Sequence, residues 1–282
     1  RKIPDISNIQ ETAAGIPIIW HDYFTNGIAY VSMFFDANII EYDKLPYLSL
    51  LKSVISYVDT DNYTYSQLND EINIETGGLS FETGLYSDRY KDTSYSLLSD
   101  LSFRALYINI PKALELVSEV LFKGKYDNDK RLYEIVAELK SKLQMAITTS
   151  GHVVASLRAS SYFSESEAVR EQINGIRFYK FIENLEKNFD KEKDDLKKEI
   201  KDIINTIVNK EGLLISYTGD REGLDILKKA LEQFGEDLDS NCRADAGSDK
   251  RPLKERKYTR FNEKLIPLNE GFKTSSTVQY VA

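Results

Sequence analysis

Histidine and cysteine are the side chains that most often perform metal or nucleophilic chemistry, and this chain contains few of them. Its 282 residues include two histidines, His21 and His152, and one cysteine, Cys242. A zinc site needs three or four converging His, Cys, Asp or Glu ligands, as a rule with some at short spacing. Neither histidine has a local partner at ligand spacing. We therefore expect structural or surface roles for both, and no metal or other cofactor bound by this chain.

Other catalytic motifs are also missing from the sequence. It has no Gly-x-Ser-x-Gly nucleophile elbow and no Gly-x-x-x-x-Gly-Lys phosphate loop. A nucleophile paired with a distant histidine stays open, although Cys242 lies in a polar stretch that is typical of a linker. The chain has 45 Asp and Glu residues, so paired carboxylates are common and single out no site. We predict no catalytic residue here.

Charge and composition argue against several classes of protein, namely nucleic-acid-binding, membrane-spanning and disulfide-rich proteins. A net charge of −8 and a pI near 5.1 argue against nucleic acid as a partner, since binding phosphates requires a basic face. The sequence has no run of about 18 apolar residues, so we predict no membrane span. A single cysteine excludes an internal disulfide framework and fits a reducing compartment. We expect the bacterial cytoplasm, or an organelle if the protein is eukaryotic.

Hydrophobic periodicity and turn signals predict the elements that would position functional side chains. Strands are expected over 28–35, 79–86, 94–108 and 213–217. Helices are expected over 45–55, 65–75, from 111 to beyond 121, and over 129–149, 151–162, 178–210 and 223–234. Thr64 and Gln67 are in register for a capping box. Groups of strands beside groups of helices predict an α+β fold, with helices layered on one face of a largely antiparallel sheet.

The same signals divide the chain into three parts. Residues 1–24 show no sustained period and contain Pro4 and Pro17, so we expect a connector from a preceding domain. One domain is predicted over 25–235. Residues 236–282 are expected to be a linker followed by the first strand of another domain. We therefore expect the chain to be a piece of a longer protein.

Several motifs, in order along the chain, resemble one known family. They are Thr25 to Val31 followed by Phe34-Phe35-Asp36, Leu45 to Leu51, Thr76 to Phe81, Ser150-Gly151-His152, Ser160 to Ser164 and Gly175 to Tyr179. This series is similar to the third of four homologous domains in presequence proteases, a subfamily of the pitrilysin/insulinase zinc metallopeptidases. The resemblance implies the α/β roll of pitrilysin-type domains.

The catalytic first domain of that family carries Leu-Pro-His-x-x-Glu-His at the start of a helix. Its two histidines bind zinc, and the glutamate is the general base for a zinc-bound water. Aligning Pro46 with the motif proline puts Tyr47 and Leu51 at the histidine positions and Leu50 at the glutamate position. Leucine neither binds metal nor accepts a proton. The resemblance thus implies a non-catalytic domain, with the zinc in the N-terminal half of the parent protein.

In this family two halves close around a chamber that holds a peptide. The resemblance implies that the chain is the non-catalytic, chamber-forming and substrate-contacting part of a zinc-dependent endopeptidase that degrades oligopeptides. Its partners would be the N-terminal catalytic half of the same polypeptide and peptide substrates, but neither nucleic acid nor membrane. The alternative is a stand-alone, zinc-free structural or interaction protein, like the core subunits of respiratory complexes that share this fold.

A peptide-contacting edge is also implied. In the family's catalytic domain, the substrate adds as a strand to the sheet edge that follows the second helix, a pairing made through main-chain hydrogen bonds. The matching residues here are Gly77, Gly78, Leu79, Ser80 and Phe81. The alternative is that the two glycines merely end the helix, which is a common use of glycine, and that the strand is interior or covered.

Overall fold

The computed structural model describes residues 8–87 and 95–241. A six-stranded sheet, counted over these residues, has the order β1-β2-β6-β3-β5-β4. Its strands are β1 (Asn8–Ala13), β2 (Ile16–Asp22), β3 (Ile28–Asp36), β4 (Leu79–Ser87), β5 (Tyr95–Leu106) and β6 (Leu213–Gly219). All neighbouring strands are antiparallel except β2 and β6, which are parallel.

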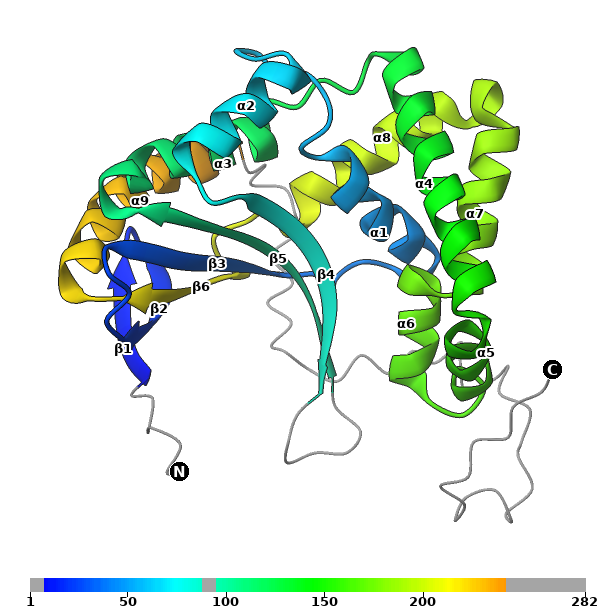
Figure 1. The fold of residues 1–282 in the computed structure, drawn as a ribbon, viewed down its shortest axis with the longest axis horizontal. Coiled ribbons are helices and arrows are strands. Elements are labelled where there is room, and N and C mark those ends of the chain that lie inside the picture. The colour runs from blue at the N-terminus through cyan, green and yellow to red at the C-terminus, as the bar shows by residue number, and fades with distance from the viewer. Residues whose placement is uncertain (1–7, 88–94, 242–282) are drawn as a thin grey trace.

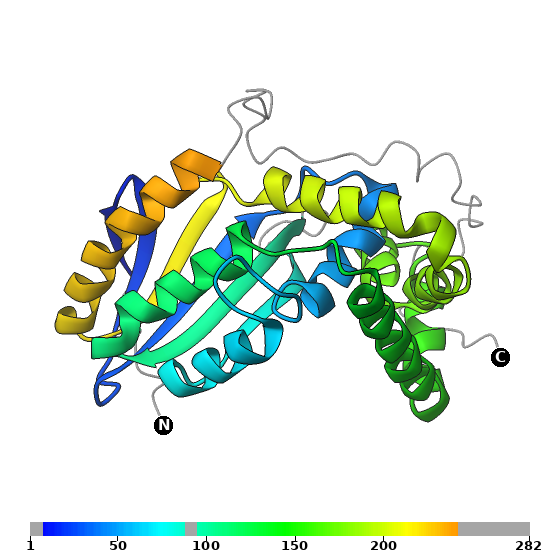
Figure 2. The same ribbon diagram turned by 90° about the horizontal axis from the view of Figure 1, so that it is seen from above.

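The helices gather on one face and at one end of this sheet. They are α1 (Leu45–Val54), α2 (Tyr65–Glu75), α3 (Ile110–Phe122), α4 (Asp129–Thr149), α5 (Gly151–Ser160), α6 (Glu165–Asn174), α7 (Ile176–Lys187), α8 (Phe189–Ile207) and α9 (Arg221–Asn241), with single 3-10 turns η1 (Tyr42–Lys44) and η2 (Tyr107–Asn109). Figure 1 shows α2, α3 and α9 above the sheet and α4 to α7 standing beyond its end. Seen from above, α9, α3 and α2 lie side by side across the strands (Figure 2).

The alternation of side chains in β3 places the core between the sheet and these helices. Ala29, Val31, Met33 and Phe35 are buried, while the residues between them are partly or largely exposed. Successive side chains of a strand point to opposite faces, so this pattern marks one buried and one open face. The predicted α+β fold, with a largely antiparallel sheet and helices on one face, is confirmed.

The two helices after β3 form as the sequence predicts. Leu45, Leu48 and Leu51 in α1 are all fully buried, and they form one stripe at spacings of three. Thr64 caps α2 with the predicted capping box: its hydroxyl accepts a hydrogen bond from the Gln67 backbone N–H, and the Gln67 side chain accepts from the Thr64 backbone.

The connector predicted for residues 1–24 is wrong where the structure describes it. Residues 8–22 form the hairpin of β1 and β2, which turns at Ala14 and Gly15, both with positive φ. Pro17 made this stretch look unlike a strand because proline donates no ladder hydrogen bond. Pairing of β2 with β6 begins only at Ile18, so the N–H that Pro17 lacks is not needed for the hydrogen bonds between β2 and β6.

Three helical predictions also need correction. The helix predicted over 178–210 is two helices, α7 and α8, separated at Asn188, whose backbone (φ −109°, ψ 20°) leaves the helical conformation. Helix α6 was not predicted at all. The linker prediction is wrong for residues 236–241, since α9 continues through them and fully buries Leu238. The rest of the predicted linker, with Cys242 and the final strand, lies outside the described residues.

Candidate functional site

Helix α1 holds the three residues that align with the family's zinc motif, and it holds them in the core. Leu50 and Leu51 are completely buried. Tyr47 is half-buried, and its ring packs edge-on against Phe181 of α7 with 4.7 Å between ring centroids. Two buried aliphatic side chains and a packed phenol ring do not form a zinc site. These residues do not fit the metal, and the helix serves packing.

The rest of α1 is also occupied by structural contacts. The Ser49 hydroxyl, almost fully buried, donates a 2.6 Å hydrogen bond to the Ile173 carbonyl near the end of α6. Burial raises the pKa of the Tyr47 hydroxyl, and the nearby Glu192 carboxylate raises it further. A tyrosine whose pKa is raised stays neutral at physiological pH. It therefore offers neither a general base nor an anionic ligand.

The two histidines lie in different parts of the fold. His21 is half-buried in β2, and His152 is exposed in the first turn of α5. Within the described ranges, no group of three or more His, Cys, Asp or Glu side chains could hold a metal ion. The structural or surface role expected for the histidines stays a prediction.

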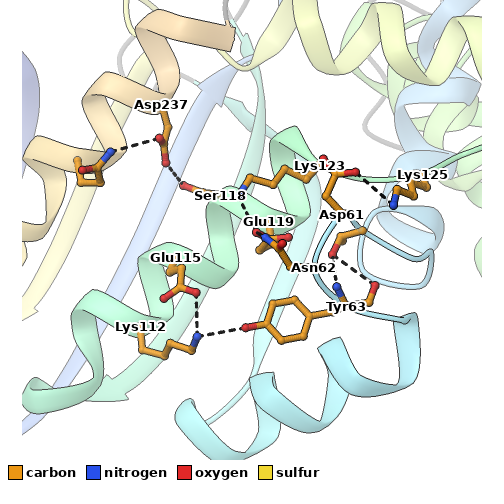
Figure 3. Close-up of polar contacts among 12 residues, drawn as sticks. Asp61, Asn62, Tyr63, Lys112, Glu115, Ser118, Glu119, Lys123, Lys125 and Asp237 are labelled. Carbon is orange, nitrogen blue, oxygen red and sulfur yellow. Dashed lines mark hydrogen bonds and ion pairs between the residues drawn. The ribbon is translucent and has the colours of Figure 1, made fainter.

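A dense polar cluster joins α3 to its neighbours (Figure 3). The Glu119 carboxylate, 1% exposed, accepts hydrogen bonds from Asn62 at 2.5 Å and from Lys123 at 2.6 Å. The neighbouring Ser118 hydroxyl donates to Asp237 of α9 at 2.8 Å. Burial alone would raise the pKa of Glu119, but the bonds from Lys123 and Asn62 lower it below its ordinary value. Glu119 is therefore a buried carboxylate whose negative charge is favoured by its partners.

Lysines on α3 and after it pair with the remaining charges of this cluster. Lys112 bonds to Glu115 at 2.8 Å and to the Tyr63 hydroxyl at 3.2 Å, while Lys125 lies 3.3 Å from Asp61 (Figure 3). These contacts fasten the loop before α2 to α3. Each carboxylate drawn here has a cationic or hydrogen-bonding partner within the domain, so the cluster links α3 to α9 and to the loop before α2.

The predicted peptide-contacting residues lie at an edge of the sheet. Strand β4 pairs with β5 along its whole length and has no strand on its other side among the described residues (Figure 1). Leu79 is half-buried, Ser80 is exposed and Phe81 is buried, as expected for an edge strand with one face in the core. Among the described residues β4 is therefore an edge strand, although α1 and α6 pack beside it and cover part of it.

Two different local features explain the glycines that lead into β4: a close contact at Gly77 and a positive φ at Gly78. Gly77 exchanges two hydrogen bonds with Arg104 of β5, each 2.7 Å long, and a Cβ on Gly77 would lie 2.7 Å from the Arg104 Cγ. Gly78 has a φ of +114°, which disfavours other residues. The close approach at Gly77 is therefore to Arg104. Whether a peptide contacts this edge stays a prediction.

Two carboxylates face each other at the β4 edge, and sequence reasoning did not single them out. Glu82 and Asp100 are directly opposite in the β4–β5 ladder. Burial raises the pKa of Asp100 to about 6, the Ser32 hydrogen bond opposes this shift, and the Glu82 charge adds to it. Lys52 of α1 lies 3.5 Å from Glu82 across the edge. Asp100 and Arg104 are the charged residues of the strand predicted over 94–108, and this is the signal that could have marked Asp100.

Comparison with known proteins identifies the family. The family model described as Peptidase M16 (subfamily C) associated matches residues 1–185, about two thirds of the chain. This chain belongs to that family, the M16-associated family for short. The match covers β1 to β5 and the helices through most of α7, including α1 and the β4 edge.

Longer proteins share the sequence of this M16-associated chain. The chain is 32% identical over 268 residues to Protein HypA of Clostridium perfringens, covering 95% of this chain and 26% of that protein. It is 24% identical over 227 residues to presequence protease 1, chloroplastic/mitochondrial, of Arabidopsis thaliana, covering 80% of this chain and 21% of that protein. The chain thus spans about a quarter or less of these relatives.

Solved structures share the fold of this M16-associated domain. A conserved protein from Enterococcus faecalis aligns with a TM-score of 0.57 over 80% of this chain and 51% of its own. A peptidase M16 inactive domain from Pseudomonas fluorescens aligns with a TM-score of 0.53 over 83% and 51%. Both are 14% identical in sequence, so they bear on the fold alone. The family match and the relatives named presequence protease confirm the predicted presequence-protease-like M16 domain, and the solved structures confirm its fold.

The prediction that nothing in the chain spans a membrane can be compared with the described helices. No helix within residues 8–87 and 95–241 is both long and apolar enough to cross a bilayer.

Proposed function

We propose that this domain is the non-catalytic, chamber-forming and substrate-contacting part of a zinc-dependent endopeptidase that degrades oligopeptides. The observation that carries the proposal is helix α1, which keeps the Leu-Pro start of the catalytic motif while its three chemical positions hold Tyr47, Leu50 and Leu51. Membership of the M16-associated family, with relatives named presequence protease, supports the same function. The zinc would belong to the N-terminal half of the parent, which would be the partner of this domain.

The proposal predicts opposite results for the isolated chain and for the full-length parent protein. The 282-residue chain should contain no stoichiometric zinc after dialysis and should not hydrolyse oligopeptides. The full-length protein should contain zinc and hydrolyse oligopeptides, and removal of the zinc should abolish this hydrolysis. About one zinc per isolated chain, or peptide hydrolysis by the chain itself, would contradict the proposal. The single cysteine further supports a reducing compartment, and we propose the bacterial cytoplasm.

The substrate contact is proposed for the free side of β4, from Gly77 and Gly78 through Leu79, Ser80 and Phe81. An edge strand presents unpaired backbone N–H and C=O groups, to which an extended peptide can add by main-chain hydrogen bonds. Lys52 and Glu82 lie beside this edge and would contact the side chains of such a peptide.

Amide hydrogen exchange of residues 78–83 tests this contact in the full-length enzyme. The zinc-site glutamate of its catalytic half is replaced by glutamine, so that a long peptide binds but is not cut. We expect slower exchange over 78–83 when the peptide is present. Strand β1 is the matched control, because it is the opposite edge of the same sheet and should not change. Equal exchange over 78–83 with and without peptide would refute the contact.

A further inference from the structure

The end of α4, the whole of α5 and the turn after it form a segment almost without charge. From Leu143 to Ser164 the sequence is LQMAITTSGHVVASLRASSYFS, and Arg158 is its one residue of the Lys, Arg, Asp or Glu type. The chain as a whole is 29% charged. We call this segment, residues 143–164, the charge-poor arm.

The single charged side chain of the arm, Arg158, interacts with groups inside the domain. The Arg158 guanidinium lies 3.3 Å from the buried Glu171 carboxylate of α6 and 5.0 Å from the Tyr162 ring centroid. Its electrostatic interactions are therefore directed to α6 and to the arm itself. The remaining polar side chains of the arm are hydroxyls, one amide and the exposed His152 imidazole. The outer surface of the arm is thus close to electrically neutral.

Large apolar side chains of the arm point to solvent. Met145 is 65% exposed, Val153 56%, Tyr162 49% and Phe163 56%. Helix α5 contains no fully buried residue, although its sequence is mainly apolar or small. It rests on α4 and α6 at the end of the molecule away from β1 (Figure 1). A surface helix normally carries charged or polar residues on its solvent side, so this surface has the composition of one that is covered.

We propose that the charge-poor arm is an interface that docks onto another domain of the same, longer polypeptide. Interface cores are depleted of charged residues, as the arm is, and the exposed Met145, Tyr162 and Phe163 are of the residue types that are enriched there. An uncharged apolar surface fits a partner surface of the same kind, so the docked domain presents apolar side chains here. The proposal goes beyond the proposed function and shares with it only that the chain is part of a longer protein.

The length of the relatives favours a partner within the same polypeptide. The chain corresponds to 26% of Protein HypA and 21% of presequence protease 1, so in each most of the polypeptide lies outside the matched part. A tethered domain has an effective concentration of about a millimolar, and a modest apolar patch then suffices for docking. A second copy of the chain would have to bind from dilute solution through the same patch.

Thiol labelling of the arm tests the docking. Val153→Cys is made in a Cys242→Ser background, both in the 282-residue chain and in the full-length protein, and its rate of reaction with a maleimide is measured. Ile74→Cys on α2 is the matched control, since Ile74 is also an aliphatic residue on a helix and is 72% exposed. We expect Val153→Cys to react about tenfold or more slowly in the full-length protein, which corresponds to an interface open about a tenth of the time or less. Ile74→Cys should react equally in both.

Three outcomes would overturn the proposal. Equal rates for Val153→Cys in the two proteins would show that nothing covers the arm. A slow rate in the isolated chain that rises on dilution would identify a second copy as the occupant. Protection of the isolated chain by a long peptide would identify substrate. None of these measurements depends on peptide hydrolysis, so the docking and the proposed function fail separately.

Discussion

Replacing Leu50 by glutamate would restore the acid that the family's catalytic motif has at this position of α1. Leu50 is completely buried, so the change removes an apolar side chain from the core and inserts a polar group without a partner. The lost burial costs about 1.5–3 kcal/mol, and the unpaired polar group about 1–3 kcal/mol more. Leu50→Gln bears the same costs without a charge and is the matched control. Leu50→Gln at any pH, and Leu50→Glu below pH 4 where its side chain is protonated, should each lose about 2.5–6 kcal/mol of a stability that is about 5–15 kcal/mol in typical domains.

The two variants should differ in their response to pH. A buried glutamate has a pKa of about 8–9, well above its unfolded value of about 4.3. The folded state then binds more protons than the unfolded state, so stability falls as pH rises above the unfolded pKa, by about 1.4 kcal/mol per unit. At pH 7 the glutamate variant should be less stable than the glutamine variant by about 4 kcal/mol. Below pH 4 the two should coincide.

Urea unfolding followed by circular dichroism measures both stabilities between pH 4 and pH 7. If Leu50→Glu is unfolded at pH 7, its refolding on acidification gives the same information, because the glutamine control shows no such recovery. A difference between the variants that does not change with pH would refute the burial of residue 50. So would a glutamate variant as stable as the original chain at pH 7.

Four further substitutions test packing and charge, each by chemical unfolding. Leu51→Ala removes a fully buried side chain and should cost about 2–5 kcal/mol; a loss below about 1 kcal/mol would contradict its core position. Gly223→Ala should cost about 1–3 kcal/mol, since its Cβ would overlap the Tyr217 hydroxyl, whereas Gly151→Ala, with open space around it, should be neutral or stabilising. Asp100→Asn should stabilise by about 1 kcal/mol at pH 7, because the raised pKa of Asp100 makes its charge unfavourable, and this gain should vanish below pH 4.

Helices with strong local signals could be predicted to the residue from the sequence. Thr64 fixes the start of α2, and the bounds of α4 follow from its long apolar stripe and from Ser150-Gly151 after it. Helix α6 has only a few apolar residues and was missed, although Ser164 caps it and Glu167 stands three positions later, a capping-box spacing that could have revealed it. Capping residues close in sequence set the ends of these helices, so the ends can be predicted from short sequence patterns.

Tertiary contacts decided the elements that the sequence did not reveal. The helix predicted to end at residue 234 continues to Asn241 and buries Leu238 in the core, and Gly235 within it lies close to Ala14 of the β1–β2 turn. Strand β1 is polar and half-exposed, and it is recognisable only once β2 is paired beside it. The candidate site shows the same limit. The family's zinc motif identifies Tyr47 from the sequence. It cannot identify Phe181, which packs on the Tyr47 ring but belongs to α7, more than a hundred residues later.

Strand β6 lies in the middle of the sheet but near the end of the described chain. It joins β2, paired through Ile18 and Ile215, to β3, and no other described strand connects the two. During synthesis the sheet therefore cannot close until almost all of this domain has left the ribosome, and its high contact order predicts slow folding. The M16-associated match ends at residue 185, before β6 and α9. A protein cut at that boundary would lack the strand that unites the sheet, so the family segment alone is not an independent folding unit.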